Sequence, residues 1–126
     1  MNAARNGVFR VDQLPDPAAP PAKSYAIDLA GCRDKDQALQ AFAAALAFPN
    51  YFGANLDAFA DCLSDLDGPN PAGYRLHVFG WQALYDADRS AFDQLIAVLR
   101  DTAELWARDA TPFEVYLIDT AHLRGI

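Results

Sequence analysis

The sequence predicts an α/β fold in which helices pack against a three-stranded parallel sheet. Three short apolar runs have the length and composition of strands: residues 25–29, 74–80 and 113–118. Between them, apolar residues recur with the period of a helix in residues 34–47, 55–66 and a segment from 86 or 88 to 108. Strands connected through helices run parallel, with right-handed crossovers. The expected order is therefore strand, helix, helix, strand, helix, strand.

The ends of the helices carry capping and breaking residues. A short polar side chain that can serve as an N-cap precedes each helix: Asp34 or Asp36, Asn55, and Asp86 or Asp88. Prolines follow the first two helices and prevent them from continuing. In the longest helix, Leu95, Leu99 and Leu105 are expected to face the core.

Composition indicates one acidic globular domain with an extension at its N-terminus. We expect the domain at residues 24–126 and a Pro- and Ala-rich extension at residues 1–23. Residues 7–11 alternate weakly, which is compatible with an edge strand, but the pattern favours an ordered tail with no function of its own.

Charge and motif content exclude several classes of protein. A formal net charge of −7 disfavours a nucleic-acid or membrane-surface binder and is compatible with a cationic partner. The chain has no apolar run of membrane-spanning length and no secretory signal in Met1–Arg10, so we expect a cytoplasmic protein. Cys32 and Cys62 have no disulfide or metal-binding spacing, and Cys62 is expected to be a buried free thiol. No metal or other cofactor is predicted.

The most informative segment is an acidic helix that follows an aromatic, glycine-containing turn. Between Tyr51 and Tyr74 the sequence has four aspartates and no Lys or Arg. Asp57, Asp61 and Asp65 are spaced by four residues, so they lie on one face of the helix, where each like-charge pair costs about 0.2–0.5 kcal/mol. Such a stripe suggests a use outside the helix, namely binding of a cationic site.

Catalysis is the weaker interpretation of these acids. A paired-carboxylate hydrolase needs two acids whose environments separate their pKa values, whereas acids on one exposed stripe share similar solvent. The spacing of an EF-hand loop is absent, and His77 and His122 have no nucleophile motif beside them. The chain therefore offers no catalytic constellation, and we expect a binding protein rather than an enzyme.

The run from Tyr51 to Leu63, YFGANLDAFADCL, closely resembles the signature of the barstar family of intracellular ribonuclease inhibitors. Residues 78–81 resemble the family's second strand, which ends in tryptophan, and Arg100-Asp101 falls where the family has Arg-Glu on its long helix. The resemblance covers residues 24–119. It implies a barstar-like fold and a protein that blocks the active site of a basic ribonuclease, as a monomer or in a 1:1 complex.

The resemblance also implies roles for individual residues. Asp61 would stand in for a substrate phosphate, Asp57 would pair with an arginine, and Tyr51 would pack on a catalytic histidine of the ribonuclease. The remaining contacts implied are from the turn, the helix end and the next helix: Gly53, Asn55, Ser64 and Asp101.

Three positions depart from the family pattern. Ala60 and Leu66 stand where the family has tryptophans, and Phe52 replaces the second tyrosine of the turn. These changes leave the target open: a barnase-type ribonuclease, a toxin domain for which this is the immunity protein, or another cationic protein.

Overall fold

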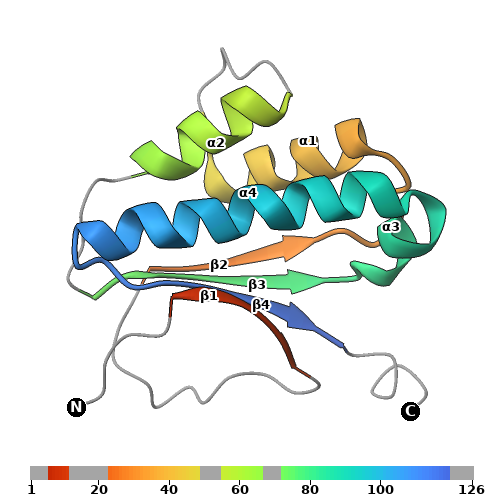
Figure 1. Ribbon diagram of the computed structural model, residues 1–126. Coiled ribbons are helices and arrows are strands. Elements are labelled where there is room, and N and C mark those ends of the chain that lie inside the picture. Colours follow the sequence, from red (N-terminus) through yellow and green to blue (C-terminus); the bar gives the residue numbers. More distant parts are fainter. Residues whose placement is uncertain (1–5, 12–22, 49–54, 67–71, 120–126) are drawn as a thin grey trace.

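The computed structural model describes residues 6–11, 23–48, 55–66 and 72–119. They form a parallel sheet with helices on one face (Figure 1). The sheet contains β1 (Gly7–Val11), β2 (Lys23–Asp28), β3 (Tyr74–Phe79) and β4 (Phe113–Ile118), in the spatial order β1-β4-β3-β2. All three strand pairings are parallel. Those of β2 with β3 and of β3 with β4 join the three predicted strands, whose helical connections predicted this direction.

The sheet has four strands rather than the three expected, because residues 7–11 form an edge strand and not a tail. Gly7 to Val11 pair in register with Glu114 to Ile118 of β4. The weak alternation of β1 has a physical reason. Val8 packs against the main core while Phe9 packs on Tyr116 on the other face, so both faces of this strand are partly buried.

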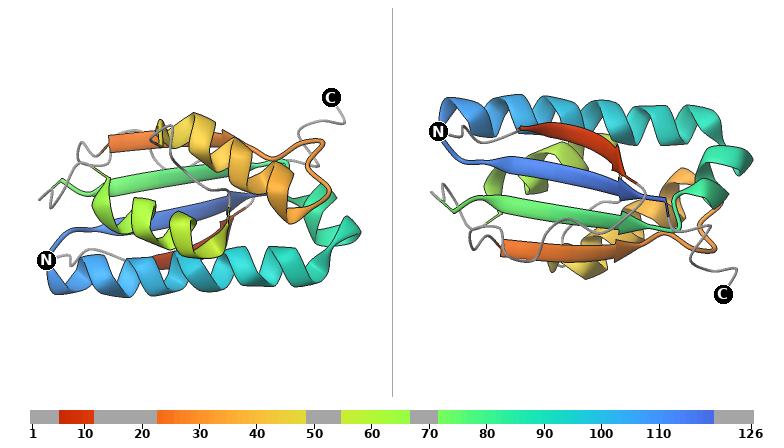
Figure 2. Two further views of the ribbon diagram at one scale, coloured as in Figure 1. Left: turned by 90° about the horizontal axis from the view of Figure 1, so that it is seen from above. Right: turned by 90° about the horizontal axis from the view of Figure 1, so that it is seen from below.

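The helices are α1 (Lys35–Leu46), α2 (Leu56–Asp65), α3 (Gln82–Ala87) and α4 (Arg89–Arg108). Seen from above, α2 lies over the middle of the sheet between α1 and α4 (Figure 2). The N-caps are Asp34, Asn55 and Asp88, whose side chains each accept a hydrogen bond from a first-turn backbone N–H. The sequence left two of these caps open. The structure shows that Asp34 rather than Asp36 caps α1, and that Asp88 rather than Asp86 caps α4.

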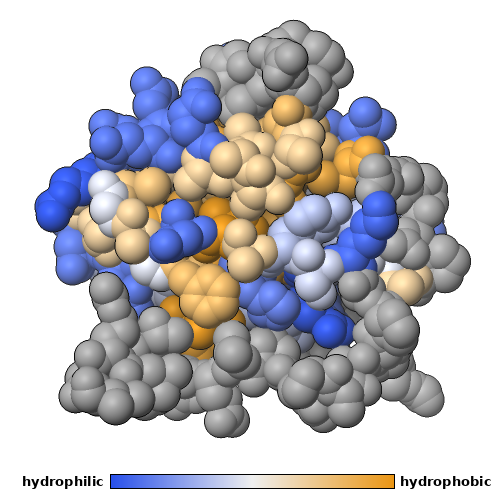
Figure 3. Space-filling view, turned by 180° about the vertical axis from the view of Figure 1, so that it is seen from behind, coloured by the Kyte–Doolittle hydropathy of each residue, from blue (hydrophilic) through white to orange (hydrophobic). Residues whose placement is uncertain are grey.

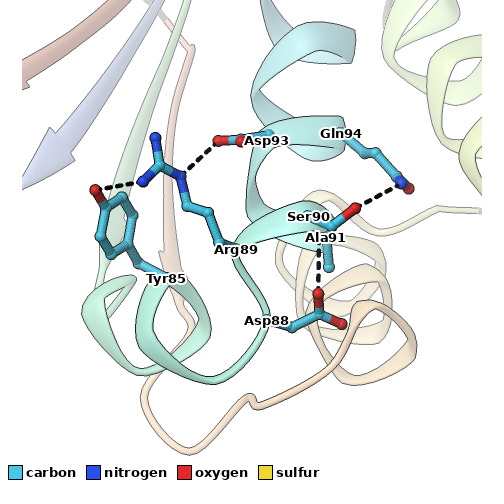
Figure 4. Close-up of polar contacts among 7 residues, drawn as sticks. All are labelled: Tyr85, Asp88, Arg89, Ser90, Ala91, Asp93 and Gln94. Atoms are coloured by element: carbon cyan, nitrogen blue, oxygen red, sulfur yellow. Dashed lines mark hydrogen bonds and ion pairs between the residues drawn. The ribbon is translucent and has the colours of Figure 1, made fainter.

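The short helix α3 was not predicted, since six residues are too few to show a helical period. It is joined to α4 through Arg89, whose guanidinium lies 4.3 Å from the centroid of the Tyr85 ring (Figure 4). The same side chain donates hydrogen bonds to the Tyr85 hydroxyl at 2.6 Å and to Asp93 Oδ1 at 2.9 Å. These contacts hold the two helices at a fixed angle around the Asp88 cap.

The main core lies between the sheet and α1, α2 and α4. Large, fully buried residues come from all of these elements, among them Tyr74, Ile27, Leu39, Phe42, Phe59, Leu63, Leu76, Leu99 and Phe113. Trp81 and Trp106 are buried packing residues, as expected. Leu105, which was predicted to face the core, is instead 46% exposed, because Thr102, Ala103 and Trp106 fill the core at that turn.

The side of the molecule formed by α1 and β2 is apolar at its centre. Figure 3 views this side and shows hydrophobic residues gathered in the middle, with hydrophilic residues around them. Helix α1 itself is rich in alanine, of which Ala44 is exposed while Ala41 and Ala45 pack partly buried against the core.

On the sheet face opposite the helices, His77 stacks on Tyr116 with ring centroids 6.1 Å apart. Nearby, Arg75 Nε donates to Glu114 Oε1 at 3.0 Å, and the Tyr116 hydroxyl donates to the same oxygen at 3.2 Å. Burial, and secondarily the charge of Arg75, lowers the pKa of His77 below its ordinary value of 6.5.

This shift makes folding stability depend on pH. Because the pKa of His77 is lower in the folded state, the unfolded state binds more protons as the pH falls. The free energy of unfolding should therefore be level above the ordinary histidine pKa and decrease as the pH falls below it. Urea denaturation between about pH 8 and 5 should show this decrease in the wild type and less of it in His77→Gln. His122→Gln is the matched control, and an equal effect in both variants would contradict the assignment to His77.

Candidate protein-binding site

Helix α2 is anchored by its apolar face. Phe59 and Leu63 are fully buried, and the Phe59 ring packs on Phe42 and Phe48 with centroids 4.9 and 6.3 Å away. At the start of the helix, Asn55 Oδ1 accepts a hydrogen bond from the backbone N–H of Ala58 at 2.8 Å. These contacts fix the rotation of α2 about its axis, and with it the direction of the opposite face.

A second anchor joins α2 to α4. The buried indole N–H of Trp106 donates to the backbone carbonyl of Leu63 at 3.0 Å. Leu63 lies in the last turn of α2, where backbone carbonyl groups lack an N–H donor from a following turn of the helix. The tryptophan therefore satisfies a helix end and holds the two helices side by side (Figure 2).

The exposed face of α2 carries the predicted acids. Asp57, Asp61 and Asp65 are all exposed, and Ser64 is exposed between them. The Ser64 hydroxyl donates to the carbonyl of Asp61 at 2.9 Å, so it lies against the helix backbone. The helix dipole favours Asp57 in the first turn but disfavours Asp65 at the last residue. The helix dipole therefore stabilises the carboxylate at one end of the stripe and destabilises the one at the other end.

None of these acids forms an ion pair within the part of the chain that the structure describes. The ion pairs there join other groups: Arg10–Asp119, Arg75–Glu114 and Arg89–Asp93. Helix α2 itself contains no Lys or Arg. Its carboxylates are therefore solvated and available to an external cation.

Asp101 lies on the exposed side of α4, the helix that packs beside α2. The structure thus places the three predicted site acids, Asp57, Asp61 and Asp101, on two adjoining helices of one layer. Asn55 serves as a cap and is exposed at the start of the stripe. Tyr51 and Gly53, the other predicted site residues, lie outside the described residues.

Cys62 is half-buried rather than buried as expected, and it is a free thiol. Burial, followed by the charges of Asp61 and Asp65, raises the pKa of its thiol. This cysteine is therefore kept in the protonated, less nucleophilic form.

The described residues contain no cluster of His, Cys, Asp or Glu suited to a metal ion. None of the helices described is long and apolar enough to cross a membrane.

Fold and site together define a small α/β protein that presents an anchored acidic helix on its surface. A family model described as Barstar (barnase inhibitor) matches residues 22–118. The match spans most of the chain, and the protein belongs to the barstar family, whose members are protein inhibitors of ribonucleases rather than enzymes. No curated protein gives a significant match.

The tryptophan anchor can be tested by removing its hydrogen bond. Trp106→Phe keeps a ring in the core but leaves the Leu63 carbonyl without its donor, which should cost about 1–3 kcal/mol in the free energy of unfolding. Trp81→Phe is the matched control, because Trp81 likewise donates to a backbone carbonyl, that of Ile118 at 3.0 Å.

Hydrogen exchange separates the two variants. Amides of α2 should exchange faster in Trp106→Phe than in Trp81→Phe, because only Trp106 contacts this helix end. Equal exchange of α2 in both variants would show that the bond to Leu63 does not hold the helix.

Proposed function

We propose that this protein inhibits a basic ribonuclease by inserting the acidic face of α2 into the cationic active site, where its carboxylates mimic RNA phosphates. The observation that carries the proposal is the solvated stripe of Asp57, Asp61 and Asp65 on a helix whose orientation is fixed by buried contacts. Membership of the barstar family supports a ribonuclease as the partner.

Preorganisation makes this surface suited to tight binding. A carboxylate that accepts hydrogen bonds from an arginine fork binds strongly only when its position is defined. Here the Asn55 cap and the buried Phe59 and Leu63 order the helix before the partner arrives, so less conformational entropy is lost on binding.

Within this proposal each residue has a role. Asp61 is the central anion, with Asp57 pairing to an arginine beside it. Asp101 adds a second acidic contact from α4. The other proposed contacts are Tyr51 on a catalytic histidine of the partner, Gly53 and Asn55 from the turn, and Ser64 near the helix end. The protein acts in the cytoplasm, without a cofactor, in a 1:1 complex.

The described structure also bears on which ribonuclease is bound. Ala60 and Leu66 are both half-buried, and Leu66 packs against the core. Neither side chain offers the exposed aromatic ring that its position has in the family pattern. A toxin ribonuclease with a matching surface, for which this protein confers immunity, is therefore a natural target.

The decisive experiment is titration of a barnase-type ribonuclease with the purified protein while RNA cleavage is followed. Wild type should inhibit stoichiometrically, and Asp61→Ala should lose most of that inhibition. Asp86→Ala removes the same charge from an exposed site on α3 and should inhibit like wild type.

Thermal unfolding controls for the fold of these variants. Asp61→Ala should unfold no earlier than wild type, because it removes like-charge repulsion with Asp57 and Asp65, about 0.2–0.5 kcal/mol per pair. Full inhibition by Asp61→Ala would exclude the site, and no inhibition by wild type would exclude a ribonuclease of this type as the target.

Ionic strength should affect the rate of association. An acidic stripe accelerates encounter with a basic partner, and salt screens this attraction over about 10 Å at 0.1 M. Stopped-flow association rates should fall steeply as salt is added, and less steeply for Asp57→Asn. If Asp57→Asn and the control Asp86→Asn have the same slope, the stripe does not steer the partner.

A further inference from the structure

Leu105 is an exposed apolar side chain on the long helix α4. In the described part of the chain, two large hydrophobic residues are exposed, Tyr85 at 36% and Leu105 at 46%. The exposure of Tyr85 is explained by its contacts, since Arg89 covers its ring and bonds its hydroxyl, and Trp81 and Phe92 pack on its edges. The exposure of Leu105 has no such explanation among the contacts of the described residues.

The position of Leu105 relates it to the acidic surface. It follows Asp101 by four residues on α4, which places both side chains on the same side of that helix, one turn apart. Its neighbour Trp106 donates to the carbonyl of Leu63 and so fixes this turn of α4 beside the last turn of α2. The turn of α4 that carries Leu105 thus lies beside the last turn of the helix that carries the stripe.

The exposed face of α2 contains no apolar side chain. The residues fully exposed on that helix are Asp57, Asp61, Ser64 and Asp65, while Leu56, Ala58, Ala60 and Cys62 are half-buried. Charged groups steer a partner and specify it, but much of the net affinity of an interface comes from apolar side chains that are desolvated at its centre. Apart from the proposed contact of Tyr51, apolar area for an interface on this surface must come from an element other than α2.

We infer that Leu105 supplies this area, as an apolar contact to the same basic ribonuclease, beside Asp101. The inference rests on the proposed function and adds a residue to it. The partner surface that fits is an uncharged, apolar patch at the rim of a cationic cleft. The aspartates bind in the cleft, and the Leu105 side chain is desolvated by contact with the apolar rim. The acids then govern the association rate, and Leu105 governs the dissociation rate.

The test measures both rates by surface plasmon resonance on an immobilised, catalytically inactive barnase-type ribonuclease. Leu105→Ala should raise the dissociation rate about three- to tenfold, the effect of withdrawing part of a leucine side chain from a dry contact. Its association rate and the salt dependence of that rate should match wild type. Leu105→Met retains apolar area and should bind as wild type does.

Two controls keep the result specific. Gln94→Ala shortens an exposed uncharged side chain elsewhere on α4 and should leave both rates unchanged. Thermal unfolding of Leu105→Ala should stay close to wild type, because nearly half of this side chain is already in water.

Each outcome decides between the inference and the proposed function. If Leu105→Ala dissociates like wild type while Asp61→Ala loses binding, the inference is overturned and the proposed function stands. Equal losses in Leu105→Ala and Leu105→Met would also overturn it, because apolar area would not be the cause. If wild type itself does not bind, a barnase-type ribonuclease is excluded as the partner, and a contact of Leu105 with that enzyme is excluded with it.

Discussion

The packing of Phe59 and Leu63 beneath α2 is the constraint on which the surface of this protein depends. These two residues join the helix to α1, to α4 and to the core above the sheet. Because they point inward, the residues half a turn away must point outward, and those are the aspartates. The same contacts that stabilise the fold therefore set the geometry of the acidic surface.

That surface is a compromise between stability and binding. Three carboxylates on one stripe, one of them at the unfavourable end of the helix dipole, disfavour the isolated helix. The buried side chains, the Asn55 cap and the Trp106 hydrogen bond offset this cost. Among the residues that the structure describes, no cation pairs with these exposed carboxylates, so they remain open to the cations of an incoming partner.

The sequence was sufficient to predict the helices and strands whose signals lie in neighbouring residues. Asn55 and the spacing of Phe59 and Leu63 predicted α2 and its exposed acids, and the helical connections predicted a parallel sheet. Contacts distant in sequence were not predictable: β1 has weak alternation because both its faces are covered, and Leu105 has core spacing although Trp106 fills that space. The link between Trp106 and the Leu63 carbonyl likewise arises only from the tertiary fold.

The pairing of β1 with β4 has a consequence for how the chain folds. Gly7 to Val11 can meet their partners, Glu114 to Ile118, only after the roughly one hundred residues between them have been synthesised. Contacts between such distant segments carry a large loop-closure entropy and form slowly. During synthesis, β1 therefore cannot pair until β4 has been made, and until then the edge of β4 that β1 covers has no partner strand.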